Sequence, residues 1–158
     1  MNWLMLVLRL IHIGGGALWV GMMAFMVFFL TPAIAEAGPQ EGGKLMAALQ
    51  RRRIMVIMPV IALLTIGSGL WLMLRVYGGP GNLAASRMGM ALNLGAAATI
   101  LAFLIGIIFM RPAMMRATVT TDPAEAQRLR ARGAMLGRLV VWLLLFALGA
   151  MAVARYLG

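Results

Sequence analysis

Residues 4–30 read LMLVLRLIHIGGGALWVGMMAFMVFFL, and one arginine and one histidine are the only titratable groups in this run. A helix needs about 20 mostly apolar residues to cross about 30 Å of hydrocarbon. Three similar stretches follow at 54–74, 88–109 and 136–153. A soluble helix this apolar would have no face for water. The sequence therefore predicts an all-α, polytopic membrane protein with four transmembrane helices in an antiparallel bundle.

The composition leaves little room for anything beside this bundle. The chain has 158 residues, of which 63% are hydrophobic and 11% are charged, whereas soluble domains carry about 25% charged residues. We therefore expect a single transmembrane domain over 1–158. The connections at about 35–53 and 112–135 are too short to fold alone, and we expect amphipathic cytoplasmic segments there. The first apolar run is too long for the core of a signal peptide, so we expect a retained span.

Basic residues dominate the charge, and their distribution predicts the topology. The net charge is +10, and ten of the 14 Lys and Arg residues lie in or beside the two long connections. The positive-inside rule places these connections in the cytoplasm and both termini outside. We expect the most basic segments to face anionic lipid headgroups or partner subunits, and no basic soluble domain is present that would bind nucleic acid. These residues are Arg51, Arg52, Arg53, Arg128, Arg130 and Arg132.

The two halves of the chain share a pattern at the end of their first helix. Residues 29–34 read FLTPAI and residues 109–114 read FMRPAM. An acidic segment and then a basic amphipathic one follow each motif, which predicts a duplicated helical hairpin. In the second copy, Asp122 is expected to cap a helix that has Pro123 in its first turn and continues into the last span. The first copy is expected to continue into its span in the same way.

Small residues at helical spacing predict where helices approach each other in lipid, because close packing replaces the hydrophobic effect there. On the first span, Ala17 and Gly21 form such a pair. On the third span, Ala91, Gly95 and Thr99 form a stripe, and Gly106 ends a second one.

His12 is the only histidine, and it lies within the first span. A titratable group inside a membrane is a functional candidate by default. Three roles are open for it. It is a neutral side chain hydrogen-bonded to Asn93, Ser68 or Thr65, a metal ligand to haem iron, copper or chlorophyll magnesium, or a proton relay.

Three consecutive glycines follow His12 and expose a nearly bare stretch of backbone. Gly14, Gly15 and Gly16 suit a closely packed neighbouring helix, a flat ligand such as a porphyrin, chlorin or quinone ring, or a kink. We therefore take His12, with these glycines, as the candidate binding site for a cofactor. Haem b, a chlorophyll-type pigment and copper are the candidate cofactors.

Catalytic residue sets are absent from the sequence. The chain has no cysteine, no second histidine and no carboxylate within a span, so neither a nucleophilic triad nor a paired-carboxylate site can form. We expect a protein that is not an enzyme. The 16 methionines include possible Cu(I) ligands, although methionine also fills gaps in apolar packing.

Residues 8–21, LRLIHIGGGALWVG, resemble the first helix of a group of bacterial four-helix membrane proteins. The group includes the copper-resistance D-like proteins and the haem-binding J-type protoporphyrinogen oxidases. Arg9, His12, Trp19 and Gly21 carry the resemblance. It implies a bacterial cytoplasmic (inner) membrane protein in which His12 is a haem or metal ligand.

Two functions follow from these observations as expectations. The first is a non-catalytic accessory subunit of a larger respiratory or photosynthetic membrane complex, which packs against other membrane subunits and lipids. The alternative is a haem- or copper-binding membrane protein that uses His12.

Overall fold

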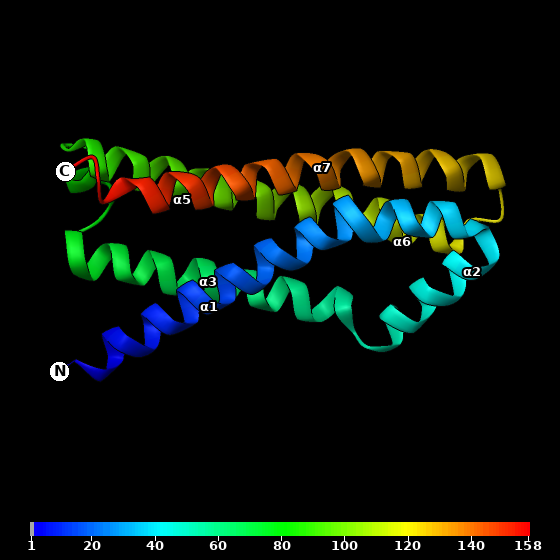
Figure 1. The fold of residues 1–158 in the computed structure, drawn as a ribbon, viewed down its shortest axis with the longest axis horizontal. Helices are drawn as coiled ribbons and strands as arrows, with labels where there is room; N and C mark the ends of the chain where they lie inside the picture. The colour runs from blue at the N-terminus through cyan, green and yellow to red at the C-terminus, as the bar shows by residue number, and fades with distance from the viewer. Residues whose placement is uncertain (1) are drawn as a thin grey trace.

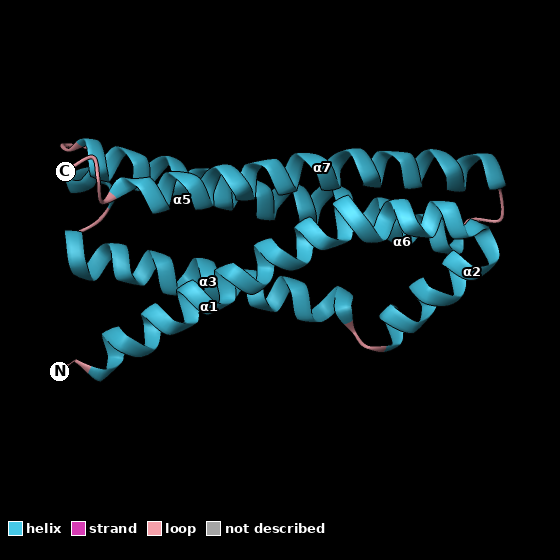
Figure 2. Cartoon of the chain, viewed as in Figure 1, coloured by secondary structure: helices cyan, strands magenta, loops and turns pink. Residues whose placement is uncertain are grey.

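The chain is a bundle of long helices (Figures 1 and 2), and residues 2–158, which the computed structural model describes apart from the side chain of Pro39, contain no strand. In chain order the elements are α1 (Trp3–Phe25), η1 (Met26–Leu30), α2 (Thr31–Arg51), α3 (Ile54–Tyr77), α4 (Pro80–Leu83), α5 (Arg87–Ile105), η2 (Gly106–Met110), α6 (Arg111–Val119) and α7 (Pro123–Ala154). The elements η1 and η2 are single π-helical turns.

Four continuous helices are long and apolar enough to cross a membrane, which confirms the predicted four-helix membrane bundle. They are Trp3–Gly38, Ile54–Tyr77, Arg87–Val119 and Pro123–Ala154. The first has 36 residues and is about 54 Å long at 1.5 Å per residue, well beyond the about 30 Å of a hydrocarbon core. The third and fourth helices also exceed this length, so they continue past the predicted ends of their spans.

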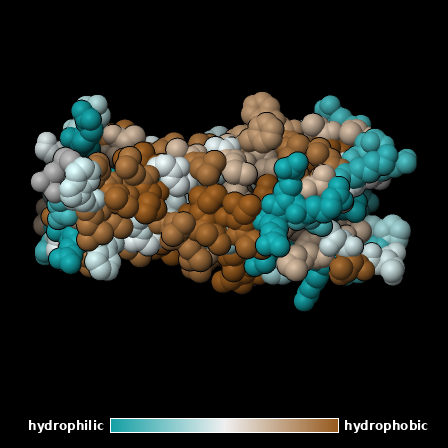
Figure 3. Space-filling view, turned by 90° about the horizontal axis from the view of Figure 1, so that it is seen from below, coloured by the Kyte–Doolittle hydropathy of each residue, from teal (hydrophilic) through white to brown (hydrophobic). Residues whose placement is uncertain are grey.

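The two ends of the bundle differ in chemistry. One end, which we call the terminal end, holds both termini and the connection at 78–86 (Figure 1). The other, the arginine-rich end, holds residues 31–53 and 111–138 and ten of the basic groups. On the face seen in Figure 3, an apolar band covers the middle, and a hydrophilic belt crosses the molecule toward the arginine-rich end. This polarity agrees with helices that leave the membrane at that end.

A π-helical turn precedes a proline in each half of the chain. Proline has no backbone N–H and its ring disturbs the carbonyl four residues earlier. In the first half, the Thr31 N–H therefore reaches the Met26 carbonyl, and in the second half the Arg111 N–H reaches the Gly106 carbonyl. The two turns start 80 residues apart and have equal length. This shared irregularity supports the duplicated hairpin.

The helices pack chiefly in two pairs, α1 with α3 and α5 with α7, as a duplicated hairpin would produce. The pairs meet in a central core that includes Trp19, Ala102 and Leu144. The Trp19 ring is 5% exposed and meets Phe103 edge-on, with ring centroids 6.5 Å apart. The ring of the tryptophan near mid-membrane therefore packs against protein rather than lipid.

The two long connections differ from each other. The Asp122 side chain accepts a hydrogen bond from the Ala124 N–H at 2.9 Å, and α7 runs unbroken into the last span, as predicted. The first connection is not continuous with α3, which corrects the prediction for that copy. Gly38 has a φ of 82° before a proline, and Arg53 has a φ of 57°. These two residues with positive φ interrupt the helical path. The chain changes direction at Gly38, continues as a helix to Arg51, and turns again at Arg53 before α3 begins.

Candidate functional site

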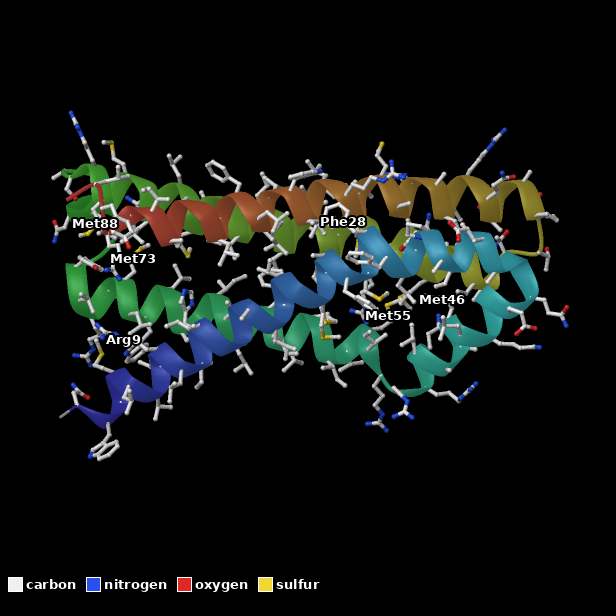
Figure 4. All side chains as sticks on the ribbon, viewed as in Figure 1. Arg9, Phe28, Met46, Met55, Met73 and Met88 are labelled. Atoms are coloured by element: carbon white, nitrogen blue, oxygen red, sulfur yellow. The ribbon has the colours of Figure 1, made fainter. Side chains whose placement is uncertain are left out.

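A cavity of about 210 Å³ lies between the two helix pairs near the terminal end. All four long helices contribute to its walls, and most of the lining is apolar. In Figure 4, Met73 lies between α3 and the α5–α7 pair, and Arg9 lies on α1 close to α3. The lining residues on which the site depends are Arg9, His12, Tyr77, Ala96 and Thr99.

The hydrophobic core closes the cavity on the side of the arginine-rich end. On α5, Thr99 lines the cavity and Ala102 lies in the core one turn later. On α3, Ile66 lines the cavity and Ala62 lies in the core one turn earlier. The cavity opens to the surface near Tyr77 and Arg9, because both residues line it and are exposed.

His12 is half-buried and is bound to the neighbouring helix of its pair. Its Nδ1 lies 2.8 Å from the main-chain carbonyl oxygen of Thr65. A carbonyl only accepts, so Nδ1 carries a proton and donates it. In the neutral ring, Nε2 is then an acceptor. Nε2 has no hydrogen bond within the described part of the chain, and it is not sealed away from the surface.

Of the three partners considered for His12, the structure brings Thr65 to it, through the main chain. The Asn93 side chain instead donates to the Pro80 carbonyl at 3.0 Å. The Ser68 hydroxyl donates within α3, to the carbonyls of Leu64 and Thr65.

Two glycines make the close contact between α1 and α3 possible. A Cβ on Gly69 would lie 2.5 Å from His12 Cε1 and 2.7 Å from His12 Nδ1. A Cβ on Gly15 would lie 2.6 Å from the Thr65 hydroxyl oxygen. Each helix therefore has a glycine where a side chain of the other helix packs: Gly69 of α3 against His12, and Gly15 of α1 against Thr65. These two contacts hold the imidazole in its place between the helices.

The remaining candidates on α1 lie differently. A Cβ on Gly16 would be in ordinary contact with Thr65, at 3.6 Å, whereas a Cβ on Gly14 would meet nothing within 4 Å. Ala17 and Gly21 are exposed, and Gly21 also has open space where a Cβ would be. The structure does not bring Ala17 and Gly21 against another helix of this chain, because they lie on the face of α1 opposite to His12.

On the third helix, the predicted stripe faces α7 and the cavity. A Cβ on Gly95 would lie 3.1 Å from the Met151 side chain, and the Thr99 hydroxyl donates to the Gly95 carbonyl at 2.8 Å. Ala91 is half-buried on the same helix. Gly106 begins η2 and has no neighbour within 4 Å of a Cβ, so the structure does not place it in a close contact with another helix.

Arg9 forms no salt bridge within the described part of the chain. The four acidic residues of the chain all belong to the arginine-rich end, and the one salt bridge among the described residues, Lys44 to Glu41 at 2.6 Å, is there too. The guanidinium at the cavity therefore keeps its donors for a ligand or for solvent.

The six arginines predicted to face lipid or partners are all exposed at the arginine-rich end, where Figure 3 shows the hydrophilic belt. They are Arg51, Arg52, Arg53, Arg128, Arg130 and Arg132. Arg111, which the sequence did not single out, has a buried Nε without a hydrogen-bond partner in the described part of the chain. It follows η2, and only the position of this π-helical turn could have indicated it.

Metal donors at the cavity are few. Residues 2–158 contain no group of three His, Cys, Asp or Glu side chains that could hold a metal ion. Met73 and Met151 line the same cavity as His12, so one imidazole nitrogen and two thioethers are the donors that this region offers. Such donors suit Cu(I), and they also match His/Met ligation of haem iron, although a cavity of about 210 Å³ is small for a porphyrin ring.

A comparison of the chain with protein-family models, with curated proteins and with solved structures found no match.

Proposed function

We propose that this protein is a non-catalytic accessory subunit of a larger respiratory or photosynthetic membrane complex, in a bacterial cytoplasmic membrane. One observation carries the proposal. Gly14, Ala17 and Gly21 form a single face of α1 that no helix of this chain covers. In lipid, small residues are valuable where another backbone packs against them. A face of this kind, left open over two turns, suits a helix of another subunit.

The rest of the molecule is compatible with such a role. The described residues contain no group of three His, Cys, Asp or Glu side chains in the spans. The other face of α1 carries His12, which binds α3, and Trp19, which lies in the core. One face of the helix therefore serves the fold, and the opposite face remains for a partner.

Gentle detergent extraction from the native membrane, followed by sizing, tests the proposal. We expect the chain to elute with a large complex. Gly21→Leu should release it as a free protein, because the larger side chain stands where the partner helix packs. Gly149→Leu is the matched control, since Gly149 is also exposed with no neighbour within 4 Å, and it should stay in the complex. Elution of the wild-type chain alone would refute the role.

The orientation is part of the proposal: both termini face outward and the arginine-rich end faces the cytoplasm. The chain has no cysteine, so single cysteines can be placed without background. Tyr156→Cys should react with a membrane-impermeant maleimide in intact cells. Gln127→Cys should react only after permeabilisation, and the reverse pattern would invert the topology.

A haem- or copper-binding role is the second candidate, because His12, whose Nε2 has no hydrogen bond in the described part of the chain, lines the same cavity as Met73 and Met151. The resemblance of residues 8–21 to the copper-resistance D-like and J-type oxidase proteins supports it as well. When bound, such a group would supply redox chemistry, and His12 with Met73 or Met151 would hold it. A purified protein whose Soret band or copper content is lost in His12→Ala would favour this role, and a colourless, copper-free protein would exclude it.

A further inference from the structure

The cavity near the terminal end combines apolar walls with a small set of unpaired polar groups. His12 Nε2 is an acceptor without a donor, and Arg9 offers donors without an acceptor. Tyr77 lines the same cavity and is partly exposed, and its hydroxyl has no hydrogen bond within the described part of the chain. A polar group in an apolar setting is stabilised when a partner reaches it. A ligand that brings both a hydrogen-bond donor for His12 and an acceptor for Arg9 would therefore match this cavity.

The tautomer of His12 decides which end of that ligand lies deepest. The Thr65 carbonyl holds the proton on Nδ1, so the neutral imidazole accepts at Nε2 and cannot donate there. The deep group of the ligand must therefore carry a hydrogen, as a hydroxyl does. Arg9 lies one turn nearer the terminal end of α1 and is exposed, so an oxygen acceptor on the ligand belongs on that side.

The size of the cavity limits what can enter. Its volume of about 210 Å³ is below the range of about 300–1,000 Å³ that is usual for drug-sized ligands. A single substituted ring fits this space better than a four-ring porphyrin. Exposed residues on the lining, among them Leu70 and Val76, open the cavity toward the surface of the bundle. An apolar tail can leave between the helix pairs by this route.

We propose that this cavity binds a ring-headed membrane amphiphile of the quinol class. One ring hydroxyl donates to His12 Nε2, the opposite oxygen accepts from Arg9, and the isoprenoid or alkyl tail runs out between the helix pairs into lipid. The inference concerns binding alone and does not depend on the accessory role. The proposed ligand is small enough for the cavity and provides a donor for His12 Nε2.

Binding of a decyl-tailed benzoquinol to the purified, detergent-solubilised protein tests this inference. The comparison ligand is its di-O-methyl ether, which has the same ring and tail without the donors. We expect the quinol to bind about tenfold more tightly than the ether, the loss that one buried hydrogen bond commonly produces. Equal affinity for the two ligands would overturn the proposal.

Variants distinguish the hydrogen bond to His12 from the volume of the cavity. His12→Leu should abolish the preference for the quinol while the ether binds as before. Ala96→Leu should fill the cavity and remove both ligands without touching His12. Arg9→Ala should weaken binding of the quinol, and Arg75→Ala is its matched control. Arg75 is also a cation of the terminal end, but it stacks over Trp71, 5.6 Å from the ring centroid, and does not line the cavity. Thermal unfolding of each variant shows that it is folded.

Two other occupants would each overturn the inference. Displacement of the quinol by phosphatidylglycerol that depends on Arg9 but not on His12 would make the cavity a lipid site. A Soret band that disappears in His12→Leu would assign Nε2 to haem iron. Retained quinol preference in His12→Leu would also contradict the proposed contact.

Discussion

Gly69→Ala offers a direct test of how His12 is positioned. A Cβ at this residue would lie 2.5 Å from His12 Cε1 and 2.7 Å from Nδ1, so the imidazole must move away from α3. The 2.8 Å hydrogen bond from Nδ1 to the Thr65 carbonyl would then lengthen or break. Hydrogen bonds between membrane helices contribute about 0.6 kcal/mol on average and up to about 1.7, and overpacking adds about 1–3 kcal/mol. We expect a loss of about 2–3 kcal/mol in the free energy of unfolding.

Unfolding by denaturing detergent or heat, in a mild detergent background, measures this loss. Gly67→Ala is the control, since Gly67 is on the same helix and has no neighbour within 4 Å of a Cβ. It should cost close to nothing. A double-mutant cycle with His12→Ala should show coupling, because removal of the ring makes room for the new methyl group. If Gly69→Ala resembles Gly67→Ala, or if the cycle shows no coupling, the described packing of His12 is wrong.

Three further changes probe the fold. Gly15→Ala should destabilise the bundle while Gly14→Ala should not, as thermal unfolding can show, because a Cβ on Gly15 would clash with the Thr65 side chain of α3 and a Cβ on Gly14 would meet nothing. Trp19→Ala should cost about 3–5 kcal/mol in the free energy of unfolding, and Trp3→Ala, which alters a 67% exposed ring, should be nearly neutral. Asp122→Ala should weaken the start of α7 by about 0.5–2 kcal/mol, and hydrogen exchange of the first-turn amides would report the loss.

The sequence predicted the helices well, because hydropathy is a property of each segment by itself. The four spans and the Asp122 cap follow from local composition and capping chemistry, and the structure has both. The π-helical turns were not predicted. The two Pro motifs were noticed as a repeat, yet a proline alone does not reveal whether a helix will end, kink or shift to π-helical hydrogen bonds.

Residues of the candidate site on a single helix could be predicted from the sequence, whereas the contacts between helices could not. His12 was identified, and Thr65 was among its considered partners, but Gly69 was missed, because the register between α1 and α3 depends on contacts across the pair. The outward direction of Ala17 and Gly21 was within reach of the sequence. His12 and Trp19 both need protein contacts and share one face of α1, and at 100° per residue that face is opposite to Ala17 and Gly21.

Photocrosslinking in intact membranes tests the proposed role most directly. A diazirine analogue in place of Leu18 keeps about the size of leucine and borders Gly14 and Gly21 on the exposed surface of α1, and a diazirine side chain at Phe146 lies at an exposed position of α7. We predict a discrete protein adduct from position 18 and lipid adducts alone from position 146. Lipid adducts alone from position 18 would contradict the proposed role, because the small-residue face would then have no partner.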